Sequence, residues 1–332
     1  MTALSDHPAR SRVVAALQAA ARAALHAPSV FNTQPWRWQI TGETLELYAD
    51  RDRTLQTTDP GGHLLMLSCG AALHHARVTL EADRWAVTVE RLPHGNNTDL
   101  LARITATGIG SANPRAERLA EAIPSRRTDR RAFGDRTVPD NLLTELRRIV
   151  EAEGAYLHLV RHDQMPMLAT STSRAADAEN NDPAYLAELQ RWTNRPAGSG
   201  DGVPPATAVQ QTARRVPVRD YAPGGTPGLA TGDGFDLGAA YVVLFGRTDQ
   251  PAELLRGGEA LSALLLTATT EGLATAPLSD TIEVQWPRLL LRDLLAEVGE
   301  PYLIVRLGYS DTTAPLPEAP RREPHDVIQV DE

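Results

Sequence analysis

The sequence contains no lysine and only one cysteine, although it has 33 basic residues, all of them arginine. Walker-type phosphate loops and pyridoxal Schiff bases both require a lysine amine, so the sequence excludes both kinds of site. The single cysteine, Cys69, excludes an intramolecular disulfide and any CxxC metal or redox site. Because Cys69 lies in the apolar run 64–69, we predict that it is a buried packing residue and not a nucleophile.

Long apolar runs and basic tracts are also missing. No run of 18 apolar residues occurs, which excludes a transmembrane helix, and residues 1–8 lack the apolar core of a secretory signal. The net charge of −9 argues against a nucleic-acid partner, since no basic tract offsets it. We therefore expect a soluble cytoplasmic protein that binds neither membrane nor nucleic acid.

The residues that are present support a sizeable core arranged in two similar series. The 332 residues, 42% of them hydrophobic, fit two domain-sized units or one large α/β body with an insertion. Hydrophobic spacing in the first series predicts a helix at 11–26, a hairpin at 37–48, a buried helix at 64–80 opened by Gly61 and Gly62, and strands at 85–92 and 100–107. The second series predicts helices at 114–123 and 139–152, strands at 155–161 and 239–246, a buried helix at 261–270 opened by Gly257 and Gly258, and a strand at 302–308. The shared order is consistent with an internal duplication.

A long segment without clear periodicity, about 180–235, interrupts the second series. Loops of this length inside a compact protein are lids, binding loops or disordered inserts. Its aromatic residues Tyr185, Trp192, Tyr221 and Phe235 provide surfaces for packing. The composition therefore favours an ordered lid.

Two polar segments carry side chains suited to a bound cofactor. Arg126, Thr128 and Arg130 place a hydroxyl between two arginines, and this set can converge on one phosphate; the alternative is a solvated basic turn. The segment 28–36 offers hydroxyl and amide groups on a frame fixed by two prolines. Amides both donate and accept hydrogen bonds, which suits the mixed polar edge of a flavin, whereas the alternative is a purely structural turn.

Two other features have simpler interpretations. His74 and His75 lie in the middle of a predicted helix without a third ligand, so a packing or surface pair is favoured over a metal site. Asp280 is the one acid in the loop that follows Pro277, and it can equally be a helix cap. We predict no metal and identify no side chain as a general acid.

Together the polar segments resemble the motifs of the nitroreductase superfamily. The pattern Pro-Ser-x-x-Asn-x-Gln-Pro-Trp is complete at 28–36, and Arg-x-Ser/Thr-x-Arg occurs at 126–130. Glu-Gly-Leu-x-x-x-Pro occurs at 271–277, and Leu-Gly-Tyr at 307–309 is followed by Arg-x-Pro at 322–324. In ordinary members the arginine motif comes first and the cofactor is held between two identical subunits. The reversed order in this sequence resembles the fused, Acg-like branch, in which one chain imitates the dimer.

The resemblance implies an α+β nitroreductase-like fold with two pseudo-symmetric halves, 1–110 and 111–332. Each half would hold a mostly antiparallel sheet flanked by helices, and the second half would carry the lid. One FMN would lie between the halves. The resemblance implies that the phosphate and ribityl chain are held by Arg126, Thr128, Arg130 and Arg322, with Arg127 nearby. It also implies that the ring and the ribityl side are contacted by Ser29, Asn32 and Gln34. The backbone beside flavin N5 would be that of Pro277, Leu278, Ser279 and Asp280.

The function implied by the resemblance is an FMN-dependent oxidoreductase. It would take hydride from NAD(P)H and pass electrons to a small organic acceptor such as a nitroaromatic or a quinone, with the cofactor carrying the redox chemistry. The alternative is a flavin-binding protein whose lid closes the site, so that it sequesters FMN and turns over little. A monomer is sufficient in either case, because one chain supplies both halves of the site.

Overall fold

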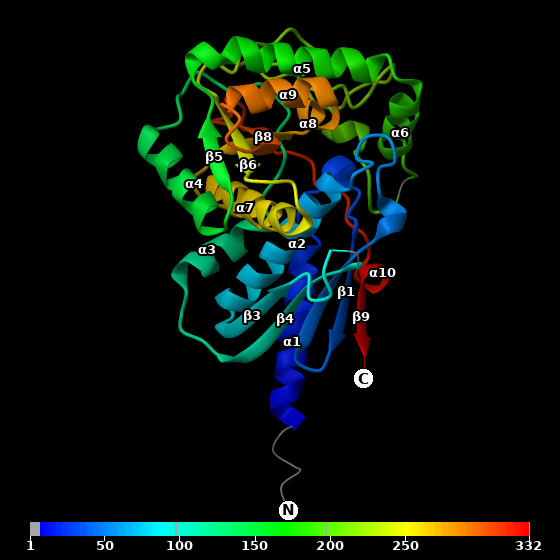
Figure 1. Cartoon of the computed structure of the whole chain (residues 1–332), viewed down its shortest axis with the longest axis vertical. Coiled ribbons are helices and arrows are strands. Elements are labelled where there is room, and N and C mark those ends of the chain that lie inside the picture. Colours follow the sequence, from blue (N-terminus) through cyan, green and yellow to red (C-terminus); the bar gives the residue numbers. More distant parts are fainter. Residues whose placement is uncertain (1–6, 97, 197, 332) are drawn as a thin grey trace, which may run out of the picture.

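The computed structural model describes residues 7–96, 98–196 and 198–331. Within these residues the strands form two sheets, one of five strands in the order β3-β4-β2-β1-β9 and one of four strands in the order β5-β6-β8-β7. All pairings are antiparallel except β1 with β9. Figure 1 shows the two sheets in separate parts of the molecule, with helices between and around them. The prediction of an α+β fold with mostly antiparallel sheets is confirmed.

The first half follows the predicted series closely. Its elements are α1 (His7–Ala24), β1 (Trp36–Thr41), β2 (Thr44–Ala49), α2 (His63–Ala82), β3 (Trp85–Arg91) and β4 (Leu100–Ile109). The buried face of the hairpin is formed by alternating residues such as Trp36, Trp38 and Ile40, which are almost fully buried. The last strand of the chain, β9 (Ile328–Asp331), pairs with β1, so the C-terminal end completes the N-terminal sheet (Figure 1).

The second half contains several elements that hydrophobic spacing did not predict. Its elements are α3 (Pro114–Ala122), α4 (Asp140–Ala152), β5 (Tyr156–Leu159), α5 (Met165–Asn180), α6 (Pro183–Thr193), β6 (Ala240–Gly246), α7 (Pro251–Thr270), β7 (Ala274–Leu278), α8 (Asp280–Glu283), α9 (Gln285–Leu294), β8 (Glu300–Gly308) and α10 (Pro324–Val327). The unpredicted ones are α5, α6, β7, α8, α9, α10 and the C-terminal β9. None of the described helices is long and apolar enough to cross a membrane.

The lid segment is more structured than the sequence indicated. Residues 183–193 form α6, which begins at Pro183 and is capped by the Asp182 carboxylate, whose Oδ1 accepts hydrogen bonds from Ala184 N (2.8 Å) and Tyr185 N (3.4 Å). The expectation of an irregular segment was therefore wrong for 183–193, whereas the described residues between 194 and 235 are irregular apart from a single 3-10 turn at Pro205–Thr207. Tyr185 and Trp192 are buried as expected, but the Phe235 side chain is 73% exposed.

The two halves meet along α2 and α7, which cross at the centre of the molecule (Figure 1). A Cβ atom built on Gly70 of α2 would lie 2.0 Å from the Leu255 carbonyl oxygen, and one on Gly258 of α7 would lie 2.1 Å from the Leu67 carbonyl oxygen. The prediction that Gly257 and Gly258 open a helix was wrong, because α7 already begins at Pro251. The glycines instead allow the two backbones to come close together.

Replacing Gly70 with alanine is expected to destabilise the protein by about 3 kcal/mol or more, because overpacking at a backbone contact typically costs about 1–3 kcal/mol and carbonyl groups of a helix cannot rotate away. Chemical denaturation would measure the change. Gly225→Ala is the matched control, since a Cβ there meets nothing closer than 3.5 Å, and it should change stability by less than about 0.5 kcal/mol. Equal stability of the two variants would contradict the close approach.

Candidate functional site

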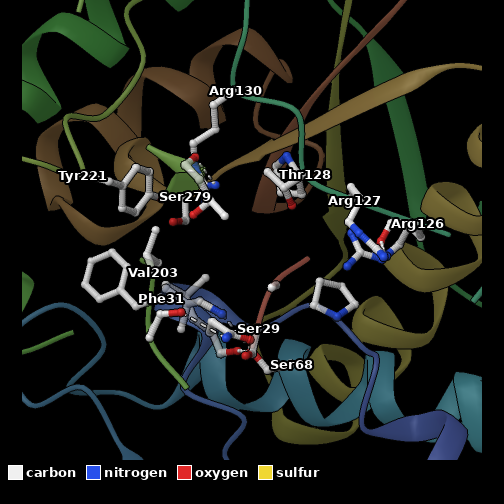
Figure 2. Close-up of a pocket in the computed structure, with 18 of the residues that line it drawn as sticks. Ser29, Phe31, Ser68, Arg126, Arg127, Thr128, Arg130, Val203, Tyr221 and Ser279 are labelled. Atoms are coloured by element: carbon white, nitrogen blue, oxygen red, sulfur yellow. Dashed lines mark hydrogen bonds between the residues drawn. The ribbon is translucent and has the colours of Figure 1, made fainter. Parts of the chain in front are cut away.

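A cavity of about 1010 Å³, solvent at its mouth included, lies between the two halves. Its wall contains residues from both halves: Pro28, Ser29, Val30, Phe31, Asn32, Leu64, Leu67 and Ser68 from the first, and Arg126, Arg127, Thr128, Arg130, Gly202, Val203, Pro204, Thr207, Tyr221, Leu261, Pro277, Ser279, Leu303, Pro317, Ala319 and Arg321 from the second. Figure 2 draws 18 of these residues, whose side chains lie around an open centre.

The described wall of this cavity contains four arginines and no carboxylate. Arg126 is only 4% exposed, and its Nε and Nη1 atoms have no hydrogen-bond partner among the residues that the structure describes. Burial, together with the nearby positive charges of Arg321 and Arg127, lowers the pKa of Arg126 to about 9. A buried cation without a counter-ion is costly, so this end of the cavity is built to receive an anion.

Arg321 belongs to the same group of cations. Burial, followed by the charge of Arg127, lowers its pKa to about 10. Its guanidinium donates to the Asn32 side-chain oxygen at 2.6 Å and to the His26 carbonyl at 3.0 Å. Arg127 forms an ion pair with Glu318 at 2.8 Å, but the Glu318 side chain is largely exposed and does not neutralise the buried charges.

The loop that carries Arg126, Thr128 and Arg130 is positioned by buried charges on its opposite side. The Arg306 guanidinium on β8 donates to the Asp129 and Arg131 carbonyl oxygens at 3.0 and 2.8 Å, and it forms an ion pair with Asp236 at 2.8 Å. These contacts fix the backbone and leave the intervening side chains free to face the cavity. The loop geometry therefore depends on residues far away in the sequence.

Arg126 and Arg130 lie at different ends of the cavity. Figure 2 shows Arg126 beside Arg127, whereas Arg130 lies on the other side, near Tyr221. The Arg130 guanidinium carbon lies 4.3 Å from the centre of the Tyr221 ring, and Nη1 donates to the Thr207 carbonyl at 3.2 Å. The prediction that the two arginines converge on one phosphate is not supported by this placement.

The turn at 29–34 is held in an unusual backbone conformation. Phe31, Asn32 and Gln34 have φ angles of 48°, 53° and 51°, which non-glycine residues seldom adopt and which cost about 1–3 kcal/mol each when strained. The Ser29 hydroxyl accepts a hydrogen bond from Gln34 N at 2.9 Å and closes the turn. Such strain is typical of functional sites that present side chains in fixed directions.

The amides of this turn bind the second half of the chain. Asn32 Nδ2 donates to the Gly202 and Pro320 carbonyls, both at 3.0 Å. Gln34 is fully buried, and its amide donates to the Gly200 carbonyl at 2.8 Å and accepts from Arg322 N at 3.0 Å. Gln34 therefore lies behind the cavity wall and not in it, whereas Ser29 and Asn32 line the cavity.

Arg322, which the sequence indicated as a phosphate ligand, also lies outside the cavity wall. Its guanidinium donates to the Gln34 and Trp36 carbonyls at 3.2 and 3.4 Å and forms an ion pair with Asp50 at 3.2 Å. The cavity is reached instead by its neighbour Arg321.

The segment 277–280 runs from the end of β7 to the start of α8, and its residues line two cavities. Pro277 and Ser279 line the main cavity. Leu278 and Asp280 line a small adjoining cavity, which also contains Arg130, Arg219 and Tyr221 and shares Pro277 and Ser279 with the main one. The Asp280 side chain is buried. Asp280 is not the N-cap residue of α8, because Ser279 occupies that position and Asp280 is the first residue of the helix.

The lid is fastened to the first half at two places. The Glu188 carboxylate on α6 accepts hydrogen bonds from the backbone amides of Gln56 (2.7 Å) and Thr58 (2.8 Å). The Asp201 carboxylate forms ion pairs with Arg53 and with Arg195, the latter at 2.7 Å. An apolar cluster lies beneath these contacts and contains Phe31, Leu55, Tyr185, Leu189, Trp192 and Val203.

Several wall residues were missed by the sequence analysis. Ser68 and Leu64 lie on α2, which periodicity identified as buried but could not orient toward a cavity. The sequence analysis identified Tyr221 only as a packing residue of the lid. It named Arg322, and not the adjacent Arg321, as a ligand of the cofactor. His74 and His75 form a buried packing pair, in which each Nδ1 contacts the Ser262 hydroxyl, at 2.7 and 2.9 Å.

Sequence comparison finds relatives of nearly the same length. "Putative NAD(P)H nitroreductase Rv3131" from Mycobacterium tuberculosis is 37% identical over 314 residues, covering 92% of this chain and 89% of that protein. "Putative NAD(P)H nitroreductase acg" from the same organism is 34% identical over 322 residues, covering 95% of each chain. No family model matches the chain.

Among solved structures, the FMN-dependent nitroreductase NfnB from Mycobacterium smegmatis in complex with NADPH aligns with 66% of this chain and 99% of its own, at 18% identity and a TM-score of 0.42. The family assignment therefore rests on the sequence relatives, whose identity extends over almost the whole length of both chains. The chain belongs to the family of nitroreductase-like NAD(P)H oxidoreductases, in its Acg-like branch.

Proposed function

We propose that the cavity between the halves binds one FMN and that the protein is an FMN-dependent oxidoreductase, which transfers electrons from NAD(P)H to a small organic acceptor such as a nitroaromatic or a quinone. The observation that carries the proposal is the Arg126 guanidinium, buried in a wall without described carboxylates and left with two unpartnered nitrogens. A phosphate group carries close to two negative charges and would satisfy it.

The residues present fit the rest of the cofactor as well. Arg126 and Arg321, with Arg127 nearby, would hold the phosphate at one end. Apolar side chains such as Leu64 and Leu261 would cover the ring, and the wall also offers hydroxyl groups to its polar edge: Ser29, Ser68 and Thr128. Arg130 lies at the other end, where a cation stabilises negative charge on a reduced ring.

FMN would supply the redox chemistry by accepting and releasing a hydride. The chain's own contribution would be positional and electrostatic. Ser279 and Pro277 would hold one edge of the site at a fixed position, because the strand β7 ends there and α8 begins. The lid residues Val203 and Tyr221 would exclude water from the cavity, which strengthens the field of Arg130.

The purified protein should be yellow, with a flavin absorbance near ~450 nm and about one FMN per chain, and anaerobic NAD(P)H should bleach it. Absorbance spectroscopy before and after the addition tests binding and reduction separately. Protein that stays colourless after incubation with excess FMN would contradict the proposal at its first step.

Replacing Arg126 with glutamine should weaken FMN binding by roughly 1.5–3 kcal/mol, the scale of a charge-assisted hydrogen bond, or about 10- to 150-fold in Kd. Riboflavin, which lacks the phosphate, should bind the variant as well as it binds the wild type. Arg130→Gln should weaken both ligands alike, because Arg130 lies at the other end of the cavity.

Calorimetric titration of both ligands against both variants makes this comparison. The stability of the apoprotein is the control, and it should not fall in Arg126→Gln, because the lost cation has no counter-ion. An equal loss of FMN and riboflavin in Arg126→Gln would place the phosphate elsewhere.

A second candidate function, sequestration of FMN, is favoured by the fastening of the lid. The carboxylates of Glu188 and Asp201 attach the lid to the first half, and Tyr221 lies in the cavity wall. A lid that stays closed would exclude nicotinamide, since hydride transfer needs the reacting atoms about 3–3.5 Å apart.

Glu188→Gln is expected to speed the anaerobic reduction of bound FMN by NAD(P)H several-fold, because a neutral amide accepts the two backbone hydrogen bonds more weakly and the lid opens more often. Stopped-flow absorbance measures this rate. Glu151→Gln, at an exposed position on α4, should leave it unchanged. Fast reduction in the wild type with no gain in Glu188→Gln would remove the case for sequestration, whereas no reduction in any variant would favour it.

A further inference from the structure

Beside the main cavity, three carboxyl groups surround a single buried guanidinium. Glu179 lies at the end of α5, Asp280 and Glu283 lie on α8, and Arg219 belongs to the lid. We call Glu179, Asp280 and Glu283 the acid cluster. Arg219 Nη2 donates to Glu179 Oε1 at 2.9 Å and to Glu283 Oε2 at 2.6 Å, and both of these ion pairs are buried.

The charges of the acid cluster do not balance if all three groups are ionised. Arg219 is the one cation that forms ion pairs with the cluster in the described part of the chain. Three carboxylates around it would leave two uncompensated negative charges in a buried place, which is strongly unfavourable. Glu283 Oε1 is buried and has no hydrogen-bond partner among the described residues, so its surroundings suit a protonated carboxyl group or a water molecule.

The groups that face the acid cluster do not supply the missing positive charge. Asp59, from the first half, faces Glu283 and adds another acid. Tyr185 and Tyr221 pack around Arg219, with ring centres 5.7 and 5.9 Å from its guanidinium carbon. Arg130 lines the small cavity as well as the main one, but its guanidinium stacks on Tyr221 and forms no ion pair with the acid cluster in the described part of the chain.

The pKa values agree with this charge count. Burial raises the pKa of Asp280 to about 6, and the negative charge of Glu283 adds to the effect, although Arg219 opposes it. Burial likewise raises the pKa of Glu283 to about 7 and raises that of Glu179. Burial also raises the pKa of Asp59 to about 7.

Asp280 connects the acid cluster with the main cavity. It lines the small cavity, whose wall it shares with Arg130, Tyr221, Pro277 and Ser279, and these four residues also line the main cavity. The small cavity has room for a water molecule, and a water there would have the Asp280 carboxyl group as one polar partner. A water in the small cavity would therefore lie between Asp280 and residues that also line the main cavity.

We propose that the acid cluster stores a proton and that Asp280 delivers it, through a water in the small cavity, to the acceptor as the acceptor is reduced. This inference rests on the proposed function, which supplies the electron pair from NAD(P)H. The O–H bond of the Asp280 carboxyl group breaks, and a new O–H bond forms on a quinone carbonyl or nitro oxygen of the acceptor. The Asp280 carboxylate then regains a proton from Glu283 or from solvent.

The test uses protein reduced beforehand with dithionite, so that it does not depend on NAD(P)H. Reoxidation by a benzoquinone, followed by stopped flow between pH 5 and 8, should slow as the pH rises through about 6, because the proton donor is lost. Asp280→Asn keeps the shape but has no acidic proton, so reoxidation at pH 5 should be about 100-fold slower and independent of pH in this range. Asp163→Asn, at an exposed position, should behave as the wild type.

A second readout needs neither cofactor nor turnover. Infrared titration of the apoprotein should show a protonated carboxyl band that disappears as the pH rises through about 6 and that is absent from Asp280→Asn. A flat pH profile of the wild type, or an unchanged profile in Asp280→Asn, would overturn the proposal, and so would the absence of the infrared band. Failure to bind FMN or to accept hydride from NAD(P)H would count against the proposed function, because the infrared titration is independent of both.

Discussion

The contact between α2 and α7 is the constraint on which the rest of the structure depends. Gly70 and Gly258 bring the two helix backbones together at a point where side chains would hold them apart. The same helices contribute Leu67 and Leu261 to the cavity wall, so the packing of the two helices positions part of that wall. A helix pair that is hydrophobic on most sides buries both faces and leaves little freedom for adjustment, because cores are close-packed.

Two groups of buried charges near this helix pair lack a full set of partners of opposite charge, and they lie in different places. The end of the cavity at Arg126 and Arg321 has buried cations and no described carboxylate in its wall, whereas the acid cluster has more carboxyl groups than cations. Each imbalance is costly by itself. Because a ligand anion would neutralise the first and bound protons would neutralise the second, both arrangements are consistent with a site that binds a phosphate and handles protons.

The sequence predicted the features that depend on local pattern. Alternation and helical spacing located most helices and strands. The two family motifs located the arginine loop and the turn at 29–34. The pairing of β9 with β1 was not predictable, because it joins residues almost 300 positions apart. Arg322 was chosen over Arg321 because the motif names a position, whereas the direction of each side chain depends on contacts such as that of Arg322 with Asp50. The role of Gly258 depends on an opposing backbone carbonyl that the sequence does not reveal.

The lid is joined to the acid cluster by the ion pairs of Arg219. Arg219 and Tyr221 are two residues apart on the lid; the first pairs with Glu283 and the second stacks on Arg130 in the cavity wall. Any movement that lifts Tyr221 from the cavity would therefore also withdraw Arg219 and admit water to the acids. The closed lid holds the pKa of Glu283 at about 7, above that of a solvated carboxyl group, so closing takes up a proton near neutral pH. By linkage, protonation of Glu283 stabilises the closed lid fully below about pH 4.5, the ordinary carboxyl pKa, and this contribution is lost as the pH rises to about 7. Proton release to an acceptor would thus loosen the lid at the moment when a product must leave.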